Sequence, residues 1–281
     1  MAISIITDST CDIAMEQWEK LNIKVLPLTI RFGGESYLDV IELDTKTFFE
    51  RLEQCDKLPT TSLIAPETFA EAFQEELEKG NDVVAVLMSS EMSGTYSSAL
   101  IAKEMVEAEN IYIVDSRNVT FGLGLLVYEA IRLREKGLTA SGIYHALEQC
   151  KSRVQVLAIL GDLKYVKMGG RLSGASAFFA SVLNIRPIVE VNFEYGQIHV
   201  HGKARGIPAC MEYINKMMRK LGVDEERQMV VANANAPELE KQFVTSLKKV
   251  TDKELIYGHV GCVVGTYCGP NSVGVAFFKK Q

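Results

Sequence analysis

The chain has 281 residues, of which 47% are hydrophobic and 23% charged, and its formal net charge is −6. This composition is ordinary for a folded protein with a sizeable core, and the acidic balance argues against a nucleic-acid surface, which needs a basic patch. No uncharged apolar run is long enough to span a membrane and the first residues lack a basic leader, so neither membrane insertion nor export is expected. The six scattered cysteines form no CxxC pair, which predicts free thiols in a cytoplasmic protein.

Strand and helix patterns alternate along the first half of the chain. Short β-branched runs recur between longer segments that have apolar residues at three- and four-residue steps. The expected strands are residues 3–7, 24–30, 83–87 and 111–115, and the expected helices are residues 13–22, 45–54, 66–80, 96–108, 119–135 and 140–150. Such alternation predicts a mainly parallel sheet with helices on both faces.

The pattern changes after about residue 153. We expect a strand at 154–160, a loop-rich helical segment at 161–174, a hairpin at 186–202 turned at Tyr195-Gly196, helices at 207–222 and 237–249, strands at 228–234 and 254–260, and two glycine-punctuated strands within 261–279. The fold class is therefore α/β with two domains: an N-terminal α/β domain at 1–152, with a mainly parallel sheet, and a C-terminal mixed α/β domain at 153–281. The default ligand site lies between them.

Three polar segments follow three of the expected parallel strands. They are "TDSTCD" (7–12), "SSEMSGT" (89–95) and "VDSRNVT" (114–120). Ligands of open α/β sheets bind at the carboxyl ends of the strands, where these segments converge. The three together predict a binding site at this edge.

Ser93, Gly94 and Thr95 lie where a buried strand gives way to a helix. Unpaired amide groups at a helix start, a glycine and two hydroxyls suit an oxyanion such as a carboxylate or phosphate. The alternative is an ordinary serine or threonine cap on a structural helix. In "KLPTTSLIAPETF", Thr61 or Ser62 is expected to supply a further donor to the same anion, and the alternative there is a loop and cap before the helix.

Two further features have competing interpretations. Arg171, which follows the pair Gly169-Gly170, either clamps an anion or pairs with a surface carboxylate. His199 and His201 share one face of a strand, but no third ligand lies at a suitable spacing, so a solvated strand face is expected rather than a metal site.

The motifs give less support to an enzymatic function. The turn at Ser93 lacks the G-x-S-x-G elbow, and no histidine can be placed beside it. The glycine-rich turns match neither the ATP-binding nor the dinucleotide-binding pattern. A serine-dependent hydrolase, or a small-molecule kinase-like enzyme using the Ser93 turn as an anion site, stays open as the alternative function.

In their order and spacing, eight motifs resemble the DegV family of bacterial fatty-acid-binding proteins, essentially end to end. They are "TDSTCD", "LPTTS", "SSEMSGTYSSA", "VDSRNVTFGLG", "LKYVKMGGRLSG", "LNIRPIVEV", "GKARG" and "GTYCGP". The resemblance implies two α/β domains that enclose one long-chain fatty acid, similar to palmitate or oleate, with no other cofactor and no metal. It places the carboxylate at Thr61, with Ser62 adjacent, and at Ser93 with Gly94 and Thr95.

The resemblance also implies a partner. Some members are the binding subunit of a fatty-acid kinase, in which a separate ATP-dependent protein phosphorylates the bound acid for phospholipid synthesis. The present chain is then a lipid-binding carrier and not an enzyme. Arg205 of "GKARG" matches a basic position that helps to dock such a partner. Apolar residues of "AFFASVLNI" (177–185) are expected in the tunnel wall, although core packing explains them equally well.

Two positions depart from the family pattern. Leu63-Ile64 stand where Gln-Pro is common, and Tyr267 stands where a histidine near the ligand head group is usual. Tyrosine donates a hydrogen bond but does not become a cation near neutral pH. We therefore expect Tyr267 to support carboxylate binding and to weaken partnership with a kinase.

Overall fold

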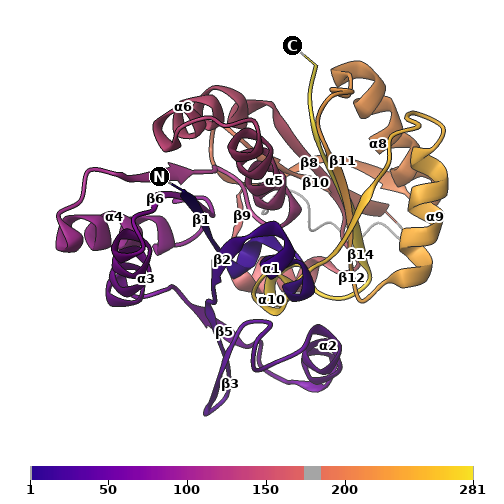
Figure 1. Cartoon of the computed structure of the whole chain (residues 1–281). Coiled ribbons are helices and arrows are strands. Elements are labelled where there is room, and N and C mark those ends of the chain that lie inside the picture. Colours follow the sequence, from indigo (N-terminus) through magenta and orange to yellow (C-terminus); the bar gives the residue numbers. More distant parts are fainter. Residues whose placement is uncertain (1, 174–184, 281) are drawn as a thin grey trace.

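The computed structural model describes residues 2–173 and 185–280, which form three β-sheets and the helices around them (Figure 1). The predicted α/β class is confirmed, with a parallel sheet in the first half of the chain and a mixed sheet in the second. Within the two described ranges, no helix is both long and apolar enough to cross a membrane.

The parallel sheet has the order β2-β1-β6-β7. Its strands are β1 (Ile3–Asp8), β2 (Ile23–Leu26), β6 (Asp82–Leu87) and β7 (Ile111–Asp115). Five consecutive residues of β6, Val83 to Leu87, are completely buried, because helices cover both faces. Figure 1 shows the pair α3 (Pro66–Glu78) and α4 (Thr95–Val106) and the pair α5 (Phe121–Glu135) and α6 (Ala140–Cys150) on opposite sides of β6, and α1 (Met15–Leu21) packs on β2.

A small antiparallel sheet has the order β4-β3-β5. Its strands are β3 (Thr29–Phe32), β4 (Glu35–Leu38) and β5 (Thr60–Ser62), with α2 (Thr45–Gln54) between β4 and β5. The single strand predicted at 24–30 is wrong, since β2 ends before Pro27 and β3 belongs to this other sheet. Proline has no amide hydrogen for the ladder, so the chain changes direction there.

The mixed sheet has the order β13-β12-β14-β8-β10-β11-β9. Its strands are β8 (Val154–Ile159), β9 (Leu172–Ser173), β10 (Ile185–Asn192), β11 (Gln197–Arg205), β12 (Met229–Ala234), β13 (Ile256–His259) and β14 (Ser272–Phe278). The expected hairpin is confirmed as β10 and β11. Two helices, α8 (Ile207–Leu221) and α9 (Pro237–Leu247), pack on this sheet.

Helix α5 lies between the parallel and mixed sheets and contacts β1 and β6 as well as β8, β12 and β14. Leu123, Leu125 and Leu126 are completely buried, although they point in different directions around the helix. A helix that is apolar on all sides is stable only when it is covered on all sides. The two sheets therefore share one core, and the domain division expected at residues 152/153 stays a prediction.

The segment after Gly261 is a helix, α10 (Cys262–Cys268), where a strand was predicted. Adjacent Val263 and Val264 favour a strand by local propensity. The buried carboxylate of Asp39 overrides that preference by accepting the amide hydrogens of Cys262 (3.1 Å) and Val263 (3.3 Å), as a capping group does. The predicted last strand is confirmed as β14, and the short α7 (Leu163–Gly169) precedes β9.

Candidate functional site

The three polar turns meet at one edge of the parallel sheet, as predicted, because β1, β6 and β7 are neighbours. Asp8 ties two of them together. Its carboxylate accepts the amide hydrogen of Thr10 (3.0 Å) in its own turn and that of Met88 (2.8 Å) after β6. Burial raises the pKa of Asp8, and these donors lower it in part.

A cavity of about 180 Å³ opens beside these turns. Its walls come from all three sheets and from α10. The lining residues are Thr10, Leu28, Thr61, Ser62, Leu63, Met88, Met92, Ser93, Gly94, Val119, Arg171, Ile198, Val263, Val264 and Tyr267. Six of the seven ligand-binding residues predicted from the sequence are thus brought together here. We call this space the head cavity.

Two hydroxyls meet across the head cavity from opposite ends of the chain. Thr61 of β5 and Tyr267 of α10 have their hydroxyl oxygens 2.6 Å apart. Both side chains are partly exposed to the cavity. One hydroxyl donates to the other, so the pair keeps one O–H free to donate to a ligand.

A second hydroxyl pair marks the start of α4. The Ser93 and Thr95 hydroxyl oxygens are 2.9 Å apart, and Thr95 is completely buried. Thr95 is the one predicted ligand-binding residue that does not line the cavity, and it contacts Ser93 instead. The first-turn cap position is Gly94, which makes no side-chain capping bond, so the ordinary serine or threonine cap is not what the structure has.

Gly94 stands at the start of α4 and lines the head cavity. A Cβ atom at this position would lie 2.8 Å from Cδ2 of Leu63, the movable end of a side chain that is 46% exposed. Because residue 94 is glycine, it has no side chain to cover the amide groups of the first turn. A helix start with this geometry attracts an anionic group.

Arg171 lies over Tyr267. Its guanidinium carbon is 4.8 Å from the centre of the tyrosine ring, and its Nη1 donates to the Gly169 carbonyl (2.7 Å). A Cβ atom at Gly169 would lie 2.2 Å from the same ring, so glycine is needed for the two segments to meet. Arg171 is exposed; it braces Tyr267 and brings positive charge to the cavity mouth.

A second, smaller cavity of about 60 Å³ lies next to the first. It lies between α5 and the mixed sheet, and most of its lining residues are apolar. They are Val119, Thr120, Phe121, Val156, Ala158, Leu160, Val189, Glu190, Val191, Ile198, Ala232, Val260, Val264, Cys268, Ser272, Val273 and Gly274. Val119, Ile198 and Val264 line both spaces. We call this second space the tail cavity.

Sequence reasoning missed two carboxylates that position α10. Asp12 accepts the Gly261 amide (2.9 Å) and the Thr120 hydroxyl, and Asp39 accepts the Ser9 hydroxyl (2.7 Å) besides the two amides of α10. Burial raises the pKa of Asp39 to about 6 and that of Asp12 well above its usual value. Asp12 lies within the polar segment "TDSTCD" but has no role of its own in the sequence analysis, and no local pattern marks Asp39.

The other predicted residues lie elsewhere. Arg205 is exposed at the far end of β11, seven residues from Ile198 and so about 23 Å along the strand. His199 and His201 are partly buried rather than solvated: His199 stacks on Tyr195, with ring centres 4.8 Å apart, and Nδ1 of His201 is 3.0 Å from the Tyr213 hydroxyl. Of the tunnel-wall segment 177–185, only Ile185 is within the described residues.

Ser93 has no base beside it. None of the four histidines of the chain lines either cavity. The hydrogen-bond partners of the Ser93 hydroxyl are the hydroxyl and amide of Thr95, and a serine nucleophile needs an adjacent proton acceptor. Among the described residues, no group of three histidine, cysteine or acidic side chains is placed to hold a metal ion.

Comparisons with known proteins cover the whole chain. The family model described as "Uncharacterised protein, DegV family" matches residues 2–280. A DegV domain-containing protein of Clostridium perfringens is 35% identical over 278 residues, which is 99% of both chains.

Two solved structures resemble this fold over their full length. A DegV family protein from Thermus thermophilus, described by its fatty acid binding, has a TM-score of 0.92 at 26% identity, with 100% of both chains covered. DegV of Bacillus subtilis, described as a fatty acid binding protein, has a TM-score of 0.84 at 32% identity, again over 100% of both chains. With the family model matched from residue 2 to residue 280, the chain belongs to the DegV family.

Proposed function

We propose that this chain binds one long-chain fatty acid, with the carboxylate in the head cavity and the acyl chain in the tail cavity, and presents it to a separate fatty-acid kinase. The observation that carries the proposal is that the two spaces are neighbours and share three wall residues, Val119, Ile198 and Val264. The head cavity carries hydroxyl donors, and the tail cavity is predominantly apolar. The relatives described as fatty-acid-binding proteins support the same ligand class.

The two hydroxyl pairs match the two oxygens of a carboxylate. Thr61 with Tyr267 and Ser93 with Thr95 each keep one free O–H after their internal hydrogen bond. A carboxylate taken out of water needs such donors, because an unpaired buried charge is costly. Arg171 at the cavity mouth and the start of α4 add favourable electrostatic potential.

The acyl chain provides most of the binding free energy. Burial of a methylene group is worth about 0.8 kcal/mol, so an acyl chain of about 15 methylenes gains roughly 12 kcal/mol before the costs of ordering are subtracted. The head group then decides which end of the lipid lies at the cavity mouth.

The absence of a base beside Ser93 favours this carrier function over the hydrolase alternative. The six free cysteines fit the cytoplasmic location proposed for such a carrier.

Mass spectrometry of the gently purified protein tests the proposal. We expect a co-purified long-chain fatty acid, which palmitate or oleate displaces with one molecule bound per chain. Ester hydrolysis or ATP turnover by the isolated chain would favour the enzyme alternatives instead. A protein that carries no lipid and binds neither added acid would contradict the proposed function.

Loss of a head-cavity donor should weaken binding. Ser93→Ala removes one donor to a buried anion and is expected to cost on the order of 1–3 kcal/mol of fatty-acid affinity. Thr61→Ala should act in the same direction, and the double variant should lose less than the sum, because both residues contact one carboxylate. Titration with oleate in a lipid-exchange assay measures all three losses.

A matched serine outside the site serves as the control for these variants. Ser246 is buried in α9 and hydrogen-bonds Asn215, so Ser246→Ala should change stability without changing oleate affinity. Wild-type retention by Ser93→Ala, by Thr61→Ala and by the double variant would move the carboxylate site elsewhere.

Tyr267 is expected to limit the kinase step. A neutral phenol cannot offset the negative charge that grows on a phosphorylated head group. Tyr267→His should therefore raise acyl-phosphate formation by a heterologous fatty-acid kinase, while oleate affinity stays within about tenfold, or about 1.4 kcal/mol. Single-turnover phosphorylation of bound oleate with the kinase in excess measures acyl-phosphate formation. A separate titration measures oleate affinity.

Tyr267→Phe is the control for this substitution, because it removes the hydroxyl that contacts Thr61 without supplying an imidazole. It should weaken oleate binding and give no gain in phosphorylation. Efficient turnover by the unmodified chain, with no increase on introducing histidine, would show that this position does not decide kinase partnership.

Arg205→Glu tests the proposed docking position in the same phosphorylation assay. We expect loss of turnover and unchanged oleate affinity.

A further inference from the structure

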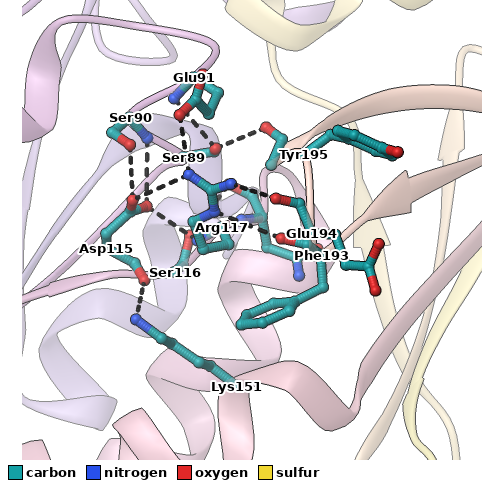
Figure 2. A network of polar contacts seen from close by, with 12 residues as sticks. Ser89, Ser90, Glu91, Asp115, Ser116, Arg117, Lys151, Phe193, Glu194 and Tyr195 are labelled. Carbon is teal, nitrogen blue, oxygen red and sulfur yellow. Dashed lines mark hydrogen bonds and ion pairs between the residues drawn. The ribbon is translucent and has the colours of Figure 1, made fainter. Parts of the chain in front are cut away.

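The tip of the β10–β11 hairpin is fastened to the edge of the parallel sheet by a network of polar contacts (Figure 2). Ser89, directly after β6, donates its hydroxyl to the Gly196 carbonyl (2.6 Å). Arg117, directly after β7, donates Nη2 to the Glu194 carbonyl (2.7 Å) and Nε to the Phe193 carbonyl (3.4 Å). All three acceptors are main-chain carbonyls of one turn, which we call the hairpin tip (residues 193–196).

Arg117 is itself held in place. Its backbone has φ +53°, and its amide donates to Oδ1 of Asp115 (3.0 Å). The same carboxylate accepts the amide and hydroxyl of Ser90 (3.2 and 2.7 Å), and Lys151 donates to the Asp115 carbonyl (2.9 Å), as Figure 2 shows. Glu91 pairs with the free side of the guanidinium at 3.1 Å. These contacts hold the arginine in the orientation in which it meets the hairpin tip.

The hairpin tip is shaped for this contact. Gly196 has φ +61°, a conformation that glycine adopts at little cost. A Cβ atom there would lie 2.6 Å from the Ser89 hydroxyl oxygen and 2.8 Å from Cζ of Arg117. The glycine is thus needed both for the turn and for the approach of the two latch residues.

The hairpin is also a wall of the tail cavity. Val189 and Val191 of β10 and Ile198 of β11 line that space. Beyond Glu190, β10 has no pairing with β8, since their ladder covers only Ile188 to Glu190. On its other side, β11 is paired with the two-residue strand β9. Among the described residues, the stretch 191–197 therefore has no ladder with a strand outside the hairpin.

A β-bulge bends the hairpin shortly before this outer part begins. Ile188 pairs with Gly202 and the next residue, Val189, pairs with Val200, so His201 is an extra residue on β11. A bulge bends a strand and interrupts its ladder. The Tyr213 hydroxyl holds the bulge by donating to the His201 carbonyl (3.2 Å). The hairpin thus has a fixed base, a bend and a fastened tip.

We propose that the outer part of this hairpin, residues 191–197, is a door over the acyl chain, hinged where the ladders with β8 and β9 end and latched by Arg117 and Ser89. This inference rests on the proposed fatty-acid function. Neither latch residue lines the head or tail cavity. Release of the latch therefore changes how fast the lipid enters and leaves, while the contacts that set its equilibrium affinity stay the same.

Stopped-flow exchange of cis-parinaric acid, a fluorescent long-chain fatty acid, tests the latch in the full chain. Arg117→Gln should raise both the association and the dissociation rate by about tenfold and leave Kd within about threefold, because a charge-assisted contact of the closed state is lost. Ser89→Ala should act in the same direction with a smaller effect. Added salt should speed exchange in the unmodified chain but not in Arg117→Gln, since the Arg117–Glu91 pair is screened.

Arg134→Gln is the matched control. Arg134 also donates to two main-chain carbonyls, those of Leu21 and Asn22 (2.7 Å each), at the end of α1. Its loss should leave the exchange rates unchanged.

The outcomes separate the two proposals. Unchanged rates in both Arg117→Gln and Ser89→Ala would overturn the latch while leaving fatty-acid binding intact. An unmodified chain that binds neither cis-parinaric acid nor palmitate would overturn the proposed function, and the door over the acyl chain with it.

Discussion

Val264→Trp is expected to abolish long-chain binding while the protein stays folded. Val264 lines both cavities, and an indole at this position enters the junction between them. The acyl chain then cannot pass from the head cavity to the tail cavity. Loss of about five buried methylenes corresponds to about 4 kcal/mol, or about a thousandfold in palmitate affinity. Isothermal titration with palmitate measures the loss, and thermal unfolding measures the stability.

Two controls distinguish a blocked path for the acyl chain from a general defect in folding. Leu100→Trp places the same side chain on the exposed face of α4, where Leu100 is 40% exposed, and should leave palmitate affinity unchanged. A short-chain acid such as butyrate, which fits the head cavity alone, should bind the Val264→Trp variant as weakly as it binds the unmodified chain. Full palmitate affinity in Val264→Trp would show that the acyl chain follows another route.

The second large effect concerns the dependence of stability on pH. Asp39 is completely buried, and burial raises its pKa to about 6 from a usual value of 3.8. A raised pKa means that the folded protein holds a proton that the unfolded chain has released. The contribution of Asp39 to the free energy of unfolding is therefore fully present below about pH 4 and is lost as the pH rises through about 6, a change of about 3 kcal/mol.

Asp39→Asn should remove this contribution and flatten the curve of stability against pH above about pH 4. Urea unfolding across the acidic to neutral range measures the slope for both proteins. Asp12 and Asp8 have raised pKa values as well. Part of the decrease in the free energy of unfolding with rising pH should therefore remain in the variant. Glu76 acts in the opposite direction, since its pKa is lowered to about 2, but its contribution changes at lower pH.

A second capping aspartate provides the control. Asp44 accepts the amide of Thr47 (3.0 Å) at the start of α2, is exposed, and has a lowered pKa. Asp44→Asn should therefore leave the slope above about pH 4 unchanged. An Asp39→Asn protein with the same slope as the unmodified chain would show that Asp39 stays ionised in the folded state.

Local patterns predicted the elements that define the parallel sheet. The β-branched run of β6 and the helical periodicity of α3 and α4 lie within short stretches of chain, where side-chain spacing decides the structure. The convergence of three polar turns followed from the rule that parallel strands end at the same edge. Ser93 and Gly94 were found in this way.

Where contacts are distant in sequence, the local patterns were insufficient. The strand expected after Gly261 is α10, because Asp39, 223 residues away from Cys262, accepts amide hydrogens at its start. The strand expected at 24–30 was divided because Pro27 ends β2. In the first place a partner distant in sequence overrode the local strand propensity, whereas in the second Pro27, inside the expected strand itself, removed a ladder donor.

Side-chain type and short-range periodicity were sufficient to predict the α/β class and the hydroxyl-rich turns, because both depend on residues that are close together in the chain. The packing of segments distant in sequence placed Thr61 against Tyr267 across 206 residues and Arg117 against a hairpin far from it in the chain. Such contacts form only when α5 packs between two sheets and buries a shared core, and that packing free energy belongs to the whole fold rather than to any segment.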